Sequence, residues 1–180
     1  MFEPKRIAKD AIAAALEKAL RYRLLNEPLE AESICRDILE VEGDNQEALV
    51  TLLLALTDQF EKQFAPALGN AKELLPKLQG EYERQYYAGI INERWGNAQL
   101  GRNVPGDSVY EWFREAMRCY EQAEQLSPPG EADAVLRWNT CVRVLQRFPH
   151  IRPRTGSMRR DLETEFGDEM PTRQPLAHND

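Results

Sequence analysis

Cysteine and histidine are the residue types best suited to nucleophilic or metal chemistry, and their spacing in this chain favours neither. Cys35, Cys119 and Cys141 lie far apart, and both histidines, His150 and His178, follow the last expected helix. A catalytic thiolate needs a neighbouring base, and a zinc site needs closely spaced ligands. We therefore expect three buried structural thiols, no disulfide and no metal site.

Other catalytic patterns are also missing from the sequence. It contains no glycine-rich phosphate loop, no histidine pair at ligand spacing and no serine, histidine and aspartate set within the helical region. The carboxylates are abundant, but at helical surface positions they are typical of a solvated face. The sequence predicts a protein that is not an enzyme and has no cofactor.

The net charge and the distribution of basic residues bear on which kinds of molecule the protein can bind. The formal net charge is −7, which argues against broad binding to nucleic acid, because phosphate binding needs a basic stripe. All six lysines fall at or before Lys77, and every later basic residue is arginine. Arginine suits carboxylate and phosphate recognition, although codon bias would produce the same distribution.

No stretch of the sequence is long enough to cross a membrane. The most apolar run, `ALVTLLLAL` from Ala48 to Leu56, is about half the length that a membrane span needs. The first twenty residues show no small-residue cleavage site after their short apolar patch. We expect a cytoplasmic protein that does not insert into membranes.

The elements that position the polar side chains are helices. Apolar residues recur at helical spacing, and glycine and proline gather at boundaries about 15 to 20 residues apart. The sequence predicts an all-α protein with helices at Lys5–Asn26, Pro28–Glu42, Asn45–Lys62, Ala65–Leu78, Gly80–Leu100, Asp107–Leu126 and Glu131–Arg147.

Two of these helices share a template of residue sizes. Separations of four, three and five residues join Ala116, Tyr120, Ala123 and Pro128, and the same separations join Ala31, Cys35, Ile38 and Gly43. The helix that precedes the Ala31 segment carries Ala15, Ala19 and Tyr22 on one face. Small residues let two antiparallel helices approach closely, and a terminal proline or glycine ends the second helix. This order of sizes resembles the tetratricopeptide repeat family.

The resemblance covers about Ala11 to Phe148 and implies a short α-solenoid of about three antiparallel helix pairs plus a terminal helix. The third pair is enlarged, because Gly89 and Ala116 lie 27 residues apart whereas Ala19 and Ala31 lie 12 apart. Leu53 and Trp138 replace the small residue that the template expects. We expect a helical repeat domain at residues 1–148.

In this family the first helix of each pair lines a concave groove, so the resemblance implies a binding surface for a peptide or helix of another protein. The residues predicted to line it are Arg23, Val50, Leu54, Asp58, Tyr86, Ile90, Arg94, Asn139 and Arg143, with Glu93 beside them. For the apolar members, a place in the core is an equal alternative. Among the tryptophans, Trp95 is the expected interface residue, because it lies nearest a loop.

These expectations favour a non-catalytic interaction scaffold; the alternative is a homo-oligomer that assembles through the same face. Residues 149–180 are expected to form a disordered tail that adds nothing to the fold, so deleting Ile151–Asp180 would leave stability unchanged. The competing interpretation is that Leu162 and Phe166 dock in the protein's own groove, with Arg143 or Arg94 pairing with Glu163 or Asp168.

Overall fold

The computed structural model describes residues 2–61, 64–102 and 104–154 of the chain, and within these ranges every regular element is helical. This confirms the all-α prediction. The elements are η1 Lys9–Ala11, α1 Ile12–Leu24, α2 Pro28–Leu39, α3 Gln46–Thr57, α4 Phe64–Leu74, η2 Leu75–Lys77, α5 Glu81–Leu100, α6 Gly106–Leu126 and α7 Asp133–Arg147.

Local signals in the sequence explain several helix boundaries. Pro28 occupies the first turn of α2, where its missing N–H costs nothing. Asn45 caps α3, and its side-chain oxygen accepts a hydrogen bond of 2.9 Å from the Ala48 backbone N–H. Ser127 adopts an extended conformation before Pro128, which ends α6, and Gly130 takes a φ of 91° in the turn that follows.

Two expected boundaries are wrong. Residues 2–8 are not helical, and α1 begins only after the 3₁₀ turn at Lys9–Ala11. Arg6 in this N-terminal arm instead donates a hydrogen bond of 3.4 Å to the Glu40 carbonyl at the end of α2. The third helix ends at Thr57, five residues earlier than Lys62.

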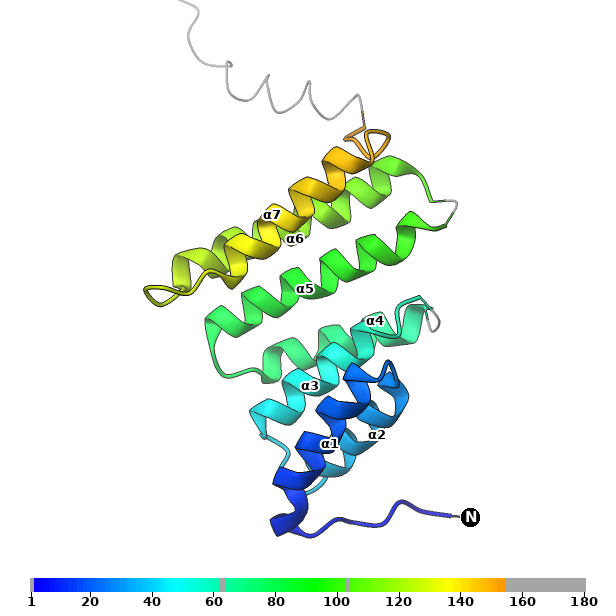
Figure 1. Ribbon diagram of the computed structural model, residues 1–180, viewed down its shortest axis with the longest axis vertical. Coiled ribbons are helices and arrows are strands. Elements are labelled where there is room, and N and C mark those ends of the chain that lie inside the picture. Colours follow the sequence, from blue (N-terminus) through cyan, green and yellow to red (C-terminus); the bar gives the residue numbers. More distant parts are fainter. Residues whose placement is uncertain (1, 62–63, 103, 155–180) are drawn as a thin grey trace, which may run out of the picture.

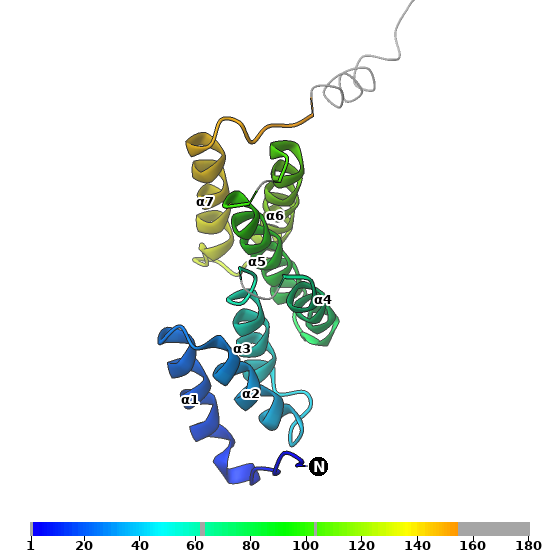
Figure 2. The same cartoon turned by 90° about the vertical axis from the view of Figure 1, so that its right-hand side faces the viewer.

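Each α-helix packs against the next one along the chain, and Figure 1 shows them following one another along the long axis from α1 to α7. The contact between α5 and α6 is the most extensive of these, and the contact between α4 and α5 is the smallest. In Figure 2, α1 lies to the left of α2, α3 to the left of α4, and α5 and α7 to the left of α6, so the odd-numbered helices lie toward the same direction from their even-numbered neighbours.

Small residues are buried where neighbouring helices pack. Ala19 of α1 and Ala31 of α2 are both fully buried. Gly89 of α5 faces the ring of Tyr120 of α6, and a Cβ at Gly89 would lie only 2.4 Å from Tyr120 Cε1. Only glycine leaves room for this ring.

Two apolar clusters make up most of the core, and α5 belongs to both. The first contains Leu53 and Phe60 together with Ile91 and Trp95 of α5. The second joins Ile90 of α5 to α6 and α7. No helix within the described ranges is both long and apolar enough to cross a membrane.

The packed part of the chain extends beyond the expected boundary at Phe148. Ile151 is 4% exposed and belongs to the second cluster, and the His150 carbonyl oxygen lies against Gly106 at the start of α6. A deletion that starts at Ile151 would therefore remove a core side chain, contrary to the expectation that it leaves stability unchanged. The remainder of the expected disordered tail, residues 155–180, lies outside the described residues.

Candidate binding surface

The four odd-numbered helices form a curved side of the molecule. Figure 2 shows α1 and α7 projecting at its left edge, with α3 and α5 set farther back between them. Eight of the nine groove residues named from the sequence lie on these helices, and Asp58 caps the end of α3.

An ionic cluster around Asp58 links three of these helices. Arg23 of α1 donates from Nε to Asp58 Oδ2 over 2.9 Å, and Arg94 of α5 donates from Nη1 to Asp58 Oδ1. Arg94 Nη1 also donates to the hydroxyl of Thr57 over 2.8 Å. The side chains of Arg23, Asp58 and Arg94 are 17%, 23% and 26% exposed, so the cluster is partly open to solvent. Two guanidinium groups share one carboxylate, which leaves N–H donors for another acceptor.

Apolar side chains lie beside this cluster. Val50 and Leu54 of α3 are half-buried, and Leu54 packs against both core clusters. Ile90 is 1% exposed, so the structure places it in the core and it does not line a surface. It is buried because α6 and α7 pack around it.

Three tyrosines of α5 lie next to the apolar residues. The rings of Tyr82 and Tyr86 are stacked with centroids 5.7 Å apart, and Tyr87 meets Tyr86 edge-on at 5.2 Å. Burial raises the pKa of Tyr82 to about 12 and also raises the pKa of Tyr87. Like ordinary tyrosines, both phenols are neutral at physiological pH, and their hydroxyl groups lie beside apolar rings.

Glu93 was expected beside the groove residues, but the structure buries it among α5, α6 and α7. It is 3% exposed and accepts hydrogen bonds from the Tyr120 hydroxyl over 2.6 Å and from Arg137 Nη1 over 3.1 Å. These bonds connect α5, α6 and α7 through one buried carboxylate. Its position four residues after Gly89, on the packing face of α5, was the signal for burial.

The remaining predicted residues lie on α7. Asn139 is half-buried, and Arg143 is exposed near the carboxyl end of the helix. Arg143 lines a cleft of about 550 Å³ between the ends of α5 and α7, and the other lining residues are Asn97, Leu100, Thr140, Val144, Arg147 and Phe148. The structure therefore gathers Arg23, Asp58, Arg94, Val50 and Leu54 and places Arg143 in a cleft of its own.

Trp95 is not an interface residue, because it is 8% exposed. Its ring meets Phe60 edge-on at 5.3 Å and Trp112 at 6.1 Å. Trp112 is the more accessible tryptophan, and the Lys72 ammonium lies 5.1 Å from the centroid of its ring. Trp112 lines a second cleft, of about 360 Å³, among α4, α5 and α6.

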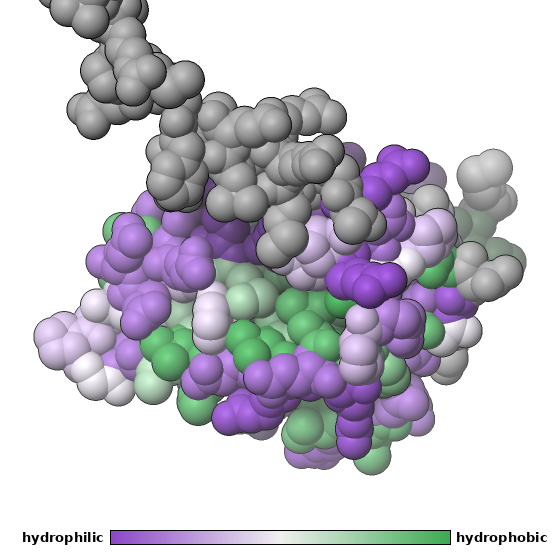
Figure 3. Space-filling view, turned by 90° about the horizontal axis from the view of Figure 1, so that it is seen from above, coloured by the Kyte–Doolittle hydropathy of each residue, from purple (hydrophilic) through white to green (hydrophobic). Residues whose placement is uncertain are grey.

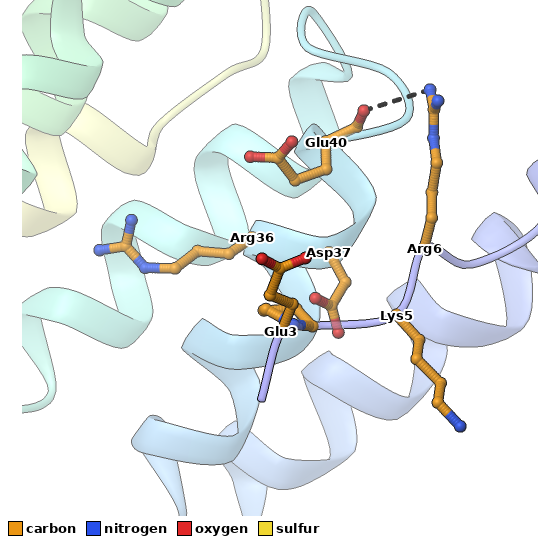
Figure 4. Close-up of a pocket in the computed structure, with 7 residues that line it drawn as sticks. Glu3, Lys5, Arg6, Arg36, Asp37 and Glu40 are labelled. Atoms are coloured by element: carbon orange, nitrogen blue, oxygen red, sulfur yellow. Dashed lines mark hydrogen bonds between the residues drawn. The ribbon is translucent and has the colours of Figure 1, made fainter. Parts of the chain in front are cut away.

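Two further surfaces stand out. The N-terminal arm and α2 enclose a cleft of about 580 Å³. Figure 4 shows that acidic and basic side chains are mixed in it and that Lys5 points away.

Figure 3, seen from the end that carries α6 and α7, shows apolar side chains gathered between polar rims.

Neither the cysteines nor the potential metal ligands of the described residues form a reactive site. All three cysteines are buried and free, as predicted, and burial raises the pKa of Cys35 and Cys141 to about 12 and that of Cys119 to about 11. These thiols are poor nucleophiles at neutral pH. Among the described residues, no three His, Cys, Asp or Glu side chains come together as metal ligands would.

Comparison with known proteins finds no family model, no curated protein and no solved structure that matches this chain.

Proposed function

We propose that this protein is a non-catalytic scaffold of tetratricopeptide-like helix pairs, and that it binds a peptide or helix of another protein on the side formed by α1, α3, α5 and α7. The observation that carries the proposal is the Arg23, Asp58 and Arg94 cluster beside the half-buried Val50 and Leu54. It combines unused guanidinium donors with apolar surface on three neighbouring helices.

The repeat architecture is supported by how small residues are used. Ala19 of α1 and Ala31 of α2 are both fully buried, and Gly89 admits Tyr120 where α5 meets α6. The template identified all three small residues from the sequence. Pairs of antiparallel helices that stack in this way create an extended surface on one side.

The chemistry of this surface fits an amphipathic segment. Leu54 and the tyrosines of α5 suit apolar side chains, and the donors of Arg23 and Arg94 suit backbone carbonyls or carboxylates. The surface is formed by side chains on helices that are fixed by core packing, so little ordering is needed on binding.

Affinity capture from the source cell, followed by mass spectrometry, tests the proposal with a matched pair of variants. Asn139→Arg adds a long charged side chain to the proposed surface, whereas Gln125→Arg likewise replaces an amide by a guanidinium at an exposed position of α6. Partners should be captured by the wild type and by Gln125→Arg and be reduced at least about tenfold with Asn139→Arg, which corresponds to about 1.4 kcal/mol. Equal capture by both variants would contradict the proposed surface.

Self-assembly is the second candidate, and exposed leucines favour it. Leu24, Leu25 and Leu29 around the turn between α1 and α2 are 88%, 61% and 55% exposed, and Leu20 of α1 is 46% exposed. Such an apolar patch is a common mark of an interface. Light scattering separates the candidates: a dimer that Leu24→Glu dissociates would support self-assembly, and a monomer at all concentrations would exclude it.

A further inference from the structure

The cleft between the carboxyl ends of α5 and α7 combines an apolar wall with two positive charges. Leu100, Val144 and Phe148 supply the wall, and Arg143 and Arg147 supply the charges. Both arginines are exposed, and neither side chain has an ion pair or hydrogen bond to another described residue. No acidic residue lines the cleft. Its chemistry fits a segment in which large apolar residues alternate with carboxylates.

The chain itself contains such a segment. Residues Asp161–Met170, `DLETEFGDEM`, carry five acidic residues together with Leu162, Phe166 and Met170, and they include no basic residue. The residues just before them, including Arg159 and Arg160, are basic and would be repelled by the cleft. Charge therefore selects the acidic stretch as the occupant.

The connection between cleft and segment is short enough. Phe148 lines the cleft, and the chain then continues past the buried Ile151 to Arg154, at the end of the molecule where α6 begins (Figure 2). Asp161 follows Arg154 by seven residues, and seven extended residues span up to about 25 Å. The end of α5 and the start of α6 are joined by only five residues, so the cleft is within this reach.

We propose that the segment Asp161–Met170, which lies outside the described residues, docks in the cleft between α5 and α7. Leu162 and Phe166 contact the wall formed by Leu100, Val144 and Phe148, and the flanking carboxylates pair with Arg143 and Arg147. This inference goes beyond the proposed function. The docked segment would cover Arg143 and so limit access of an acidic partner to the α7 end of the binding surface.

Limited proteolysis of the full chain with a glutamate-specific protease tests the contact, because a docked segment is cut more slowly than a free one. The double variant Arg143→Glu and Arg147→Glu should release the segment. Cleavage after Glu163 and Glu165 should then become at least about tenfold faster, the equivalent of about 1.4 kcal/mol of docking. The matched control, Arg114→Glu and Arg118→Glu on the exposed face of α6, should leave the rate unchanged.

A second variant keeps the test decisive if the double variant fails to fold. Phe166→Ser changes no described residue and should accelerate cleavage to a similar extent. Equal rates in the wild type and Phe166→Ser would overturn the proposal, and so would equal acceleration by both double variants. A wild-type rate that falls as protein concentration rises would show docking on a second copy and would also overturn it. No partner protein is present, so the result is independent of the proposed function.

Discussion

The same template position is filled differently in two halves of the molecule: the apolar half is the packing around α3, and the polar half is the packing of α5 against α6 and α7. In α3 the position holds Leu53, which is fully buried among apolar side chains. In α5 it holds Gly89, which admits the ring of Tyr120. The first solution fills the space with the helix's own side chain, and the second fills it with a side chain from the partner helix.

The second solution has chemical consequences that the first does not. A buried tyrosine hydroxyl needs a hydrogen-bond partner, which is Glu93, one turn after Gly89. A buried carboxylate in turn needs a compensating charge, which Arg137 of α7 provides. In α3 the residue one turn after Leu53 is Thr57, whose hydroxyl donates to the Leu54 carbonyl of its own helix and accepts a hydrogen bond from the partly exposed Arg94 of α5. One glycine therefore explains why α7 is attached through a polar network.

The largest effect is expected for Leu53→Ala in the apolar half. The side chain is fully buried, so the truncation loses burial and leaves a cavity, at a cost of about 4 kcal/mol in the free energy of unfolding. Denaturant titration measures this cost. The control Leu136→Ala removes a leucine that is 58% exposed and should change stability by less than about 0.5 kcal/mol. Similar costs for the two would mean that Leu53 is not packed as described.

Gly89→Ala should destabilise the other half for the opposite reason. The added Cβ would lie 2.4 Å from the ring of the fully buried Tyr120, which has no room to move. Overpacking should outweigh the gain in helix propensity and leave a net loss of about 2 kcal/mol in the free energy of unfolding. Thermal or denaturant unfolding provides the measurement.

Gly69→Ala in α4 is the matched control, because nothing lies within 4 Å of its added Cβ. It should stabilise the helix by up to about 1 kcal/mol. If both glycine variants were stabilising, the close approach of α5 and α6 would be contradicted.

Much of the fold was predictable because its signals are local. Pro28, Asn45 and Pro128 act through their own backbone and side-chain geometry, so the start of α2, the start of α3 and the end of α6 fall within one residue of the prediction. The small residues Ala19, Ala31 and Gly89 marked the helix contacts for the same reason.

The candidate site was less predictable because burial depends on distant elements. Ile90 and Trp95 are buried by residues of other helices. Ile151 is buried although it lies between Pro149 and Pro153, two residues that are typical of a loop. The partner of Glu93 on α7 follows it by 44 residues. Helical periodicity places each side chain on a face, but it does not say which neighbour covers that face.

Tyr120→Phe tests the polar half without changing its packing. The variant leaves Glu93 buried with one partner fewer, and the free energy of unfolding should fall by about 1.5 kcal/mol, the low end for a hydrogen bond to a charged group. Denaturant titration at neutral pH measures the loss. An unchanged stability would mean that the hydroxyl contributes no net energy.

The same variant makes a prediction about alkaline pH. Burial and the Glu93 carboxylate raise the pKa of Tyr120 above its ordinary value of 10.0. The folded state therefore keeps the proton when the unfolded state loses it, so this contribution is present below pH 10 and is lost as pH rises above it. The stability advantage of the wild type over Tyr120→Phe should shrink as pH increases from 10.

The smallest effect is expected where the two halves are joined at the surface. Asp58 pairs with Arg23 of α1 and Arg94 of α5, and α5 is the helix that both core clusters share. Asp58→Asn keeps one carbonyl acceptor and removes the charge, so two guanidinium groups would face each other across a neutral amide. Because all three side chains are partly solvated, the expected loss is only about 1 kcal/mol in the free energy of unfolding.

The loss caused by Asp58→Asn should diminish as salt is raised from 0.1 to about 1 M, since solvent-accessible charge interactions are screened. The cost of Leu53→Ala should not diminish. Asp44→Asn, at an exposed position before α3, serves as the control and should have no comparable effect. A salt-independent loss for Asp58→Asn would mean that Asp58 acts through packing, and the contrast between an apolar half and a half joined to it by charge would then fail at this point.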